Sequence, residues 1–185
     1  MDKKFVSRAG LKLEHALKFF NISVRSKVCA DLGVSTGGFT DCLLQNGAKK
    51  VYAVDTAYGV LEWKIRHDPR VVTMEKTNAL YLTLPLVMDF ISIDVGWTQQ
   101  KLIVPRAVEL LKNNGDIVSL LKPHYEADKS WRRKGTLLAE FIPKTIDKVK
   151  NDLSNLDLEI QGITQSPIIG SKGGNIEYLM WIRKI

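Results

Sequence analysis

Hydrophobic and polar residues follow two repeating patterns along this chain. Between Ser7 and Phe20 the apolar residues recur at helical spacing, which predicts an amphipathic helix near the start of the chain. Further on, short apolar runs rich in β-branched residues are typical of strands buried on both faces. We expect such strands at Val28–Val34, Val51–Asp55, Val71–Met74, Phe90–Val95 and Ile117–Leu121.

The intervals between these strands have the pattern of helices. Helices are predicted at Gly38–Gln45, Val60–Arg66, Lys101–Lys112 and Leu137–Leu153. Strands that alternate with helices indicate a parallel sheet with right-handed crossovers. The last two apolar runs, Leu158–Thr164 and Ile176–Arg183, are joined by a segment containing several Gly and one Pro, which favours an antiparallel hairpin. The predicted fold class is therefore α/β, with a doubly wound, mostly parallel seven-stranded sheet and an antiparallel C-terminal hairpin.

The composition favours one compact domain. The chain has 185 residues, of which 45% are hydrophobic, and this is enough for a single core. Cys29 and Cys42 are too far apart for a CxxC pair and lie in apolar stretches, so we expect packed, reduced thiols. The sequence has no run of about 18 apolar residues and no apolar segment following its N-terminal charges. We therefore expect a cytoplasmic protein without a membrane span.

The net charge of +7 points to a polyanionic partner, because clustered cations gain affinity by releasing condensed counterions. Basic residues concentrate at Lys3–Arg8, Lys129–Lys134 and Arg183–Lys184. A solvated basic surface without a partner is the alternative interpretation.

A glycine-rich loop follows the first predicted strand and opens the first predicted helix. Open α/β sheets bind ligands beyond the carboxyl ends of their strands, where glycines let the backbone approach a ligand closely. Asp55 ends the second strand, where a carboxylate can accept hydrogen bonds from both hydroxyls of a ribose. The predicted cofactor-binding residues are Asp31, Gly33, Ser35, Thr36, Gly37, Gly38, Phe39, Asp55, Asn78 and Asp94.

The loop lacks the G-x-G-x-x-G spacing of dinucleotide enzymes, so an adenosine ligand without a pyrophosphate is favoured. We expect S-adenosyl-L-methionine, with Asp31 near its ammonium group and Asn78 at the adenine edge. A tight strand-to-helix turn is the alternative for the glycines, and a simple turn residue is the alternative for Asn78.

Two charged residues end the fourth and fifth predicted strands, at the same edge of the sheet as the glycine loop. These are Asp94 and Lys122, and a mutual salt bridge is the structural alternative to a chemical role. Trp97 follows closely, and it is interpreted either as a stacking surface for a nucleotide or as a core residue. No Pro-Pro-Tyr follows Asp94, which argues against methylation of an amino group and favours a hydroxyl acceptor.

Several ordered motifs together resemble one family. Ser7–Leu13 (SRAGLKL), Asp31–Asp41 (DLGVSTGGFTD), Tyr52–Asp55 (YAVD) and Lys122–Glu126 (KPHYE) are similar to segments of the TlyA (hemolysin A) proteins. The segments Ser166–Gly170 and Asn175–Tyr178 continue the resemblance, which covers nearly the whole chain from about Val6. These proteins belong to the FtsJ-like ribose 2′-O-methyltransferases, which have a Rossmann-like fold.

The resemblance implies a Lys-Asp-Lys-Glu catalytic tetrad, which falls on Lys12, Asp94, Lys122 and Glu177. It also implies ribosomal RNA or ribosomal subunits as the partner. For RNA contacts we expect Arg8, Trp97, Arg132, Arg133 and Lys134. In-line methyl transfer requires no metal. Whether Lys122 removes the hydroxyl proton or orients the hydroxyl as a cation stays open.

For domain organisation we expect one methyltransferase domain over residues 1–185, with a helical extension at 1–22. Relatives usually carry an N-terminal S4 RNA-binding domain, and we expect none here. Two other functions compete with this one. The chain is then either a methyltransferase of another substrate or a non-catalytic RNA-binding factor with a vestigial cofactor site. The oligomeric state is not predicted.

Overall fold

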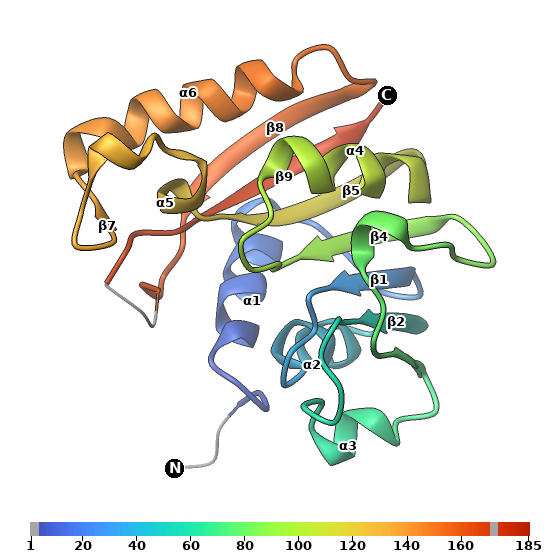
Figure 1. Cartoon of the computed structure of the whole chain (residues 1–185). Coiled ribbons are helices and arrows are strands. Elements are labelled where there is room, and N and C mark those ends of the chain that lie inside the picture. The colour runs from blue at the N-terminus through green and yellow to red at the C-terminus, as the bar shows by residue number, and fades with distance from the viewer. Residues whose placement is uncertain (1–3, 171–173) are drawn as a thin grey trace.

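The computed structural model describes residues 4–170 and 174–185. Over these residues the chain forms a seven-stranded sheet in the order β3-β2-β1-β4-β5-β9-β8 (Figure 1). Strands β1 to β5 pair in parallel, whereas β9 pairs antiparallel with both β5 and β8. The strands are β1 (Val28–Leu32), β2 (Lys50–Val54), β3 (Val71–Met74), β4 (Met88–Ile93), β5 (Leu111–Leu121), β8 (Leu158–Gln165) and β9 (Tyr178–Lys184). The predicted fold class is confirmed.

Helices cover both faces of the sheet, so that the strands are buried on both sides. One face carries α1 (Ala9–Phe19), α2 (Gly38–Gln45) and α3 (Trp63–Arg66). The other carries α4 (Gln100–Leu110) and α6 (Ile142–Leu153). The shorter elements are α5 (Pro123–Glu126), η1 (Ala79–Tyr81), η2 (Lys129–Trp131), η3 (Ala139–Phe141) and a small hairpin of β6 (Arg132–Arg133) with β7 (Thr136–Leu137).

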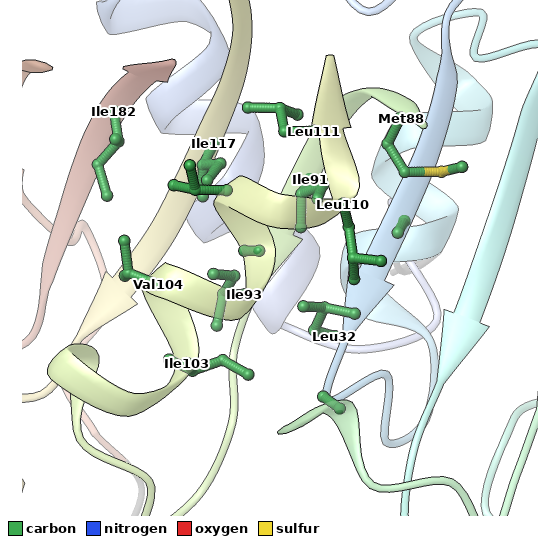
Figure 2. Close-up of a cluster of buried hydrophobic side chains, with 14 of the residues drawn as sticks. Leu32, Met88, Ile91, Ile93, Ile103, Val104, Leu110, Leu111, Ile117 and Ile182 are labelled. Atoms are coloured by element: carbon green, nitrogen blue, oxygen red, sulfur yellow. The ribbon is translucent and has the colours of Figure 1, made fainter. Parts of the chain in front are cut away.

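Side-chain alternation along each strand divides the core into two layers. On β1, Cys29 packs with the α1 and α2 layer, whereas Ala30 and Leu32 pack with the α4 layer. Figure 2 shows the second layer, in which residues of α4 such as Ile103 and Val104 lie over the sheet. Truncating one of these fully buried aliphatic side chains to Ala costs about 2–5 kcal/mol. The sheet is therefore a rigid platform for the loops at its carboxyl edge.

Several predicted helix boundaries are wrong. The helix predicted from Val60 begins only at Trp63, because Glu62 has extended backbone angles and its side chain accepts a hydrogen bond from Trp63 N. The helix predicted from Leu137 begins at Ile142, and Pro143 occupies its first turn, where a missing N–H is tolerated. Leu137 lies instead in the hairpin β6–β7, which was not predicted.

The remaining differences lie at strand ends. The helix predicted to reach Lys112 ends at Leu110, and β5 starts at Leu111 because this residue pairs with Met88 across an irregular register. The last strand begins at Tyr178 rather than at Ile176. Within the part of the chain that the structure describes, no helix has the length and apolar character needed to cross a membrane.

Candidate functional site

The loops after β1 and β4 meet at the carboxyl edge of the sheet, where the strand order reverses. From β1 the chain continues to β2 on one side, and β4 pairs with β1 on the other. Gly33 follows β1 with φ of +90°, and a Cβ there would lie 2.5 Å from the backbone oxygen of Asp94. Only glycine allows this approach, so the two loops form one crevice, the usual ligand site of a doubly wound sheet.

Two adjoining cavities open in this crevice and share Gly33, Ser35 and Asp94 in their walls. The smaller cavity, of about 230 Å³, extends towards β2 and η1. The larger, of about 350 Å³, extends towards α1 and the loop after β5. Because Asp94 belongs to both walls, it stands at the junction of the two spaces.

The smaller cavity has the chemistry of a site for a nucleoside that carries no phosphate. Asp55 lies in its wall, and its carboxylate accepts hydrogen bonds from Ser35 N at 2.7 Å and Ala57 N at 2.8 Å. Apolar side chains, among them Leu80 and Ile103, line the same space. Among the described residues in its lining there is no Lys or Arg, whereas Asp55 and Asp94 supply two carboxylates. This set suits ribose hydroxyls and a cationic ligand and disfavours a pyrophosphate.

Asn78 also lines the smaller cavity. Its side-chain oxygen accepts a hydrogen bond from Leu80 N at 3.0 Å and so caps η1. The structure therefore shows the turn role for this oxygen, in a position beside the predicted adenine site.

The residues of the glycine loop divide between the cavity wall and its support. Ser35, Thr36 and Phe39 line the larger cavity. Gly37 and Gly38 line neither cavity: Gly37 has φ of +98° and caps α2, and a Cβ on Gly38 would lie 2.2 Å from Ser7 Oγ. Gly38 therefore lets α2 approach the N-terminal segment, whereas Gly37 lies against Leu61 and Ile65.

Asp31 is in the wall of neither cavity, and its expected place beside an ammonium group, directly or through water, stays a prediction. It is fully buried, and its carboxylate accepts hydrogen bonds from Thr40 Oγ1 at 2.7 Å and Ser92 Oγ at 2.9 Å. Burial raises the pKa of Asp31 to about 7, in spite of these two hydrogen bonds. Its position between β1, β4 and α2 makes it a support of the loop.

The four predicted tetrad residues line the larger cavity together. Lys122 Nζ is ion-paired with Asp94 Oδ1 at 2.6 Å and donates a hydrogen bond to Val95 O at 3.1 Å. Lys12 Nζ lies 2.5 Å from Glu177 Oε2, and both side chains are more than 90% buried. The cavity is thus walled by two ion pairs, one at the ends of β4 and β5 and one between α1 and the start of β9.

Aromatic residues stand at the edge of the larger cavity. Trp97, with φ of +61°, is 83% exposed, so the interpretation as a core residue is wrong. Its ring stacks on Tyr125 at 4.9 Å between centroids, and the Tyr125 ring centre lies 5.8 Å from Lys122 Nζ. Tyr125 was missed by sequence reasoning, although its place three residues after Lys122 was a usable signal.

His124 and Glu126 were also missed. His124 lines the larger cavity, and burial, followed by the nearby Lys122 and Arg132, lowers its pKa to about 4, so its imidazole is neutral at neutral pH. Glu126 is buried, which raises its pKa, and it accepts a hydrogen bond from Gln100 N at 2.8 Å. That bond ties the loop after β5 to the start of α4.

The predicted phosphate-binding cations differ in their surroundings. Arg8 is exposed and lines the larger cavity, and Arg133 and Lys134 are exposed on the hairpin β6–β7. Arg132 is only partly exposed, and its Nη2 donates to Ala127 O at 3.1 Å. The expectation that Arg132 serves a phosphate in the same way as its neighbours is therefore not supported by its position.

Comparison with known proteins identifies the family. The model of the FtsJ-like methyltransferases matches residues 5–184. The chain belongs to the FtsJ-like methyltransferase family. Its doubly wound sheet is shared with other methyltransferases, such as N-methyltransferase NodS from Bradyrhizobium japonicum, which is 17% identical with a TM-score of 0.62 over 96% of this chain and 98% of that one.

Similar FtsJ-like relatives carry names that refer to ribosomal RNA or hemolysin. The Bacillus subtilis protein YqxC is 44% identical over 96% of this chain, which spans 65% of the length of YqxC. The 16S/23S rRNA (cytidine-2′-O)-methyltransferase TlyA of Mycobacterium tuberculosis is 36% identical over 98% of this chain and 69% of TlyA. A solved Lactococcus lactis structure superposes with a TM-score of 0.94 at 42% identity, covering all of this chain and 90% of that one.

S-adenosylmethionine is the methyl donor of this FtsJ-like domain, and the residues present fit it. Asp55 offers a carboxylate to the ribose, and the apolar wall of the smaller cavity suits the adenine. The Asp94 carboxylate at the junction of the cavities suits the positive charge of the sulfonium.

Proposed function

We propose that this chain transfers a methyl group from S-adenosylmethionine to a ribose 2′-hydroxyl of ribosomal RNA. The observation that supports it most directly is the meeting of Lys12, Asp94, Lys122 and Glu177 in one cavity that adjoins the nucleoside cavity. The name of the Mycobacterium tuberculosis relative states the same reaction on 16S and 23S rRNA. We further propose that residues 1–185 act as one methyltransferase domain in the cytoplasm, and that the helical segment at 1–22 contributes Lys12.

The bound donor supplies an electrophilic methyl group on a sulfonium. The chain has to hold the ribose oxygen in line with it and manage the hydroxyl proton. Lys122 is ion-paired with Asp94 and donates one N–H to Val95 O, so its ammonium has a further N–H for the ribose oxygen. Asp94 fixes Lys122 beside the junction of the cavities, where donor and acceptor have to meet.

In this proposal, Lys12 and Glu177 form the opposite wall and orient the target nucleotide. The exposed stack of Trp97 on Tyr125 offers an aromatic face to the base, as aromatic side chains do in RNA-binding sites. Arg8, Arg133 and Lys134 offer exposed cations for phosphates. The net charge of +7 supports a polyanionic substrate.

Methylation of purified ribosomal subunits tests the proposal. The chain is incubated with labelled S-adenosylmethionine and either 30S or 50S subunits, and any 2′-O-methyl mark is mapped on the RNA. We expect a mark on a single nucleotide or a few. Methylation of a small molecule or protein but not of RNA would show that the proposed substrate is wrong. Donor binding without turnover on any subunit would favour a non-catalytic RNA-binding factor.

A further inference from the structure

The hairpin β6–β7 presents two cations to solvent on a tight turn. Lys134 and Gly135 both have positive φ, of 50° and 81°, which is the two-residue turn that matches the twist of antiparallel strands. The turn exposes Arg133 and Lys134. The hairpin has only two residue pairs, so its own ladder holds it weakly in place.

Asn175 holds this hairpin from a distant part of the chain. Its side chain is buried, its Oδ1 accepts a hydrogen bond from Leu137 N at 3.0 Å, and its Nδ2 donates to Gly135 O at 3.3 Å. The amide thus pairs with the hairpin backbone as the peptide group of a neighbouring strand would. Replacing it with an apolar residue leaves the buried Leu137 N without its partner, and it also removes the donor to Gly135 O, at an exposed residue.

The backbone around Asn175 leads directly to the larger cavity. Asn175 O accepts a hydrogen bond from Gly170 N at 2.9 Å, and Gly170 lines that cavity. Two residues further on, Glu177 O accepts from Ser166 N at 2.8 Å while its carboxylate pairs with Lys12. A Cβ on Gly170 would lie 3.0 Å from Glu177 Oε1, so the packing here is close. The Asn175 side chain therefore bonds the basic turn to the backbone segment that carries Glu177 two residues further on.

We propose that Asn175 is a positioning residue that sets the basic turn at a fixed distance and angle from the larger cavity. RNA held at Arg133 and Lys134 then presents its ribose to the larger cavity, in which Lys122 and the Lys12–Glu177 pair lie. This inference rests on the proposed function, because it assigns the turn to RNA. Its role is exerted through the hairpin, so Asn175 itself touches neither RNA nor donor.

Steady-state methylation of purified 50S or 30S subunits, whichever the wild-type chain methylates, tests the inference. Asn175→Ala removes two hydrogen bonds of modest net value, and we expect the KM for the subunit to rise about tenfold. The dissociation constant for S-adenosylhomocysteine stays within about twofold, since the donor cavity is untouched. Asn155→Ala, at an exposed position between α6 and β8, is the matched control and leaves KM unchanged.

A double-mutant cycle separates positioning from a general loss of structure. In the background Arg133→Ala with Lys134→Ala, the turn has no cations to position, so adding Asn175→Ala should change KM by less than about twofold. The inference would be overturned if adding Asn175→Ala raised KM by the same factor in this background as in the wild-type chain. It would also be overturned if Asn175→Ala alone had the wild-type KM. If the wild-type chain methylates neither subunit, the proposed function is wrong. That result differs from a failure of the positioning role, in which the wild-type chain methylates a subunit and the Asn175 variants do so equally well.

A second variant covers the case in which Asn175→Ala does not fold. Asn175→Asp keeps an acceptor for Leu137 N but sets a carboxylate oxygen against Gly135 O, so we expect KM to rise at least about tenfold, as in Asn175→Ala. A thermal unfolding curve recorded for each variant shows whether it is folded. A folded Asn175→Asp chain with wild-type KM in subunit methylation would also reject the positioning role.

Discussion

Lys12 Nζ lies 2.5 Å from Glu177 Oε2, although 165 residues separate the two along the chain. The pair joins α1 to the residue that precedes β9, and both side chains are buried. Two buried charges pay a large desolvation cost unless each has its partner. The pair therefore makes the N-terminal helix part of the cavity wall.

Removing one member of this pair should destabilise the fold more than removing both. Lys12→Met leaves the Glu177 carboxylate buried without its cation, and we expect the free energy of unfolding to fall by about 3–5 kcal/mol. Lys12→Met combined with Glu177→Gln should recover part of this loss. Urea unfolding of the wild-type chain, both single variants and the double variant measures the coupling. Additive losses would mean that the ion pair is not what stabilises this contact.

Asp55→Ala should weaken donor binding. The substitution removes a carboxylate that faces the smaller cavity and that also accepts hydrogen bonds from Ser35 N and Ala57 N. A lost charged hydrogen bond corresponds to about 1.5–3 kcal/mol, or roughly ten- to hundredfold in affinity. Calorimetry with S-adenosylhomocysteine gives the value, with the exposed Glu140→Ala as control. Unchanged affinity in Asp55→Ala would place the ribose elsewhere.

Lys122→Ala should abolish ribose methylation while leaving donor affinity nearly unchanged. The ammonium group lies in the larger cavity beside Asp94, where the acceptor is proposed to bind, and it is not in the wall of the smaller cavity. Single-turnover methylation of ribosomal subunits measures transfer, and calorimetry measures binding. Lys101→Ala, on the exposed side of α4, serves as control. Transfer at the wild-type rate in Lys122→Ala would remove this residue from the mechanism.

The paired change Arg133→Ala and Lys134→Ala should reduce the salt dependence of RNA binding. Each phosphate contact contributes about 0.7–0.9 to the slope of log affinity against log salt, so the slope should flatten by about 1.5. Arg25→Ala with Lys49→Ala is the matched control, because both cations are exposed and precede β1 and β2, at the opposite edge of the sheet. Filter binding to isolated ribosomal RNA between low and moderate salt gives both slopes. Equal flattening in the two double variants would show that the hairpin has no special role.

Asp31 should make the stability of the chain depend on pH. Its pKa is raised from 3.8 to about 7, chiefly by burial, so the folded state binds a proton more tightly than the unfolded state. The contribution of protonated Asp31 to the free energy of unfolding is complete below about pH 4 and is lost as the pH rises to about 7. Asp31→Asn carries no charge, so the unfolding free energy of wild type relative to this variant should fall across that interval. Chemical denaturation at a series of pH values tests this, and a constant difference would contradict the assignment.

Local patterns were enough to predict the sheet and the place of the site. Short β-branched runs alternating with helical segments specify parallel strands, because each element has to bury an apolar surface with its own period. Residues that follow such strands meet at the carboxyl edge of the sheet, which is why Gly33, Asp55, Asp94 and Lys122 line two adjoining cavities there. The family resemblance added Lys12 and Glu177, which no periodicity connects.

The surroundings of each of these side chains depend on contacts that form only in the folded chain. Asp31 turns inward to Thr40 and Ser92, and no sequence rule tells a buried carboxylate at a strand end from one that faces a ligand. The hairpin β6–β7 is bonded by the Asn175 amide, whose partners lie 38 and 40 residues away. The order of the elements and the edge of the sheet where the candidate site lies could therefore be predicted from the sequence, since both follow from local periodicity. The orientation of each side chain was left to contacts between distant segments, because burial and hydrogen bonding depend on all the elements packed around it.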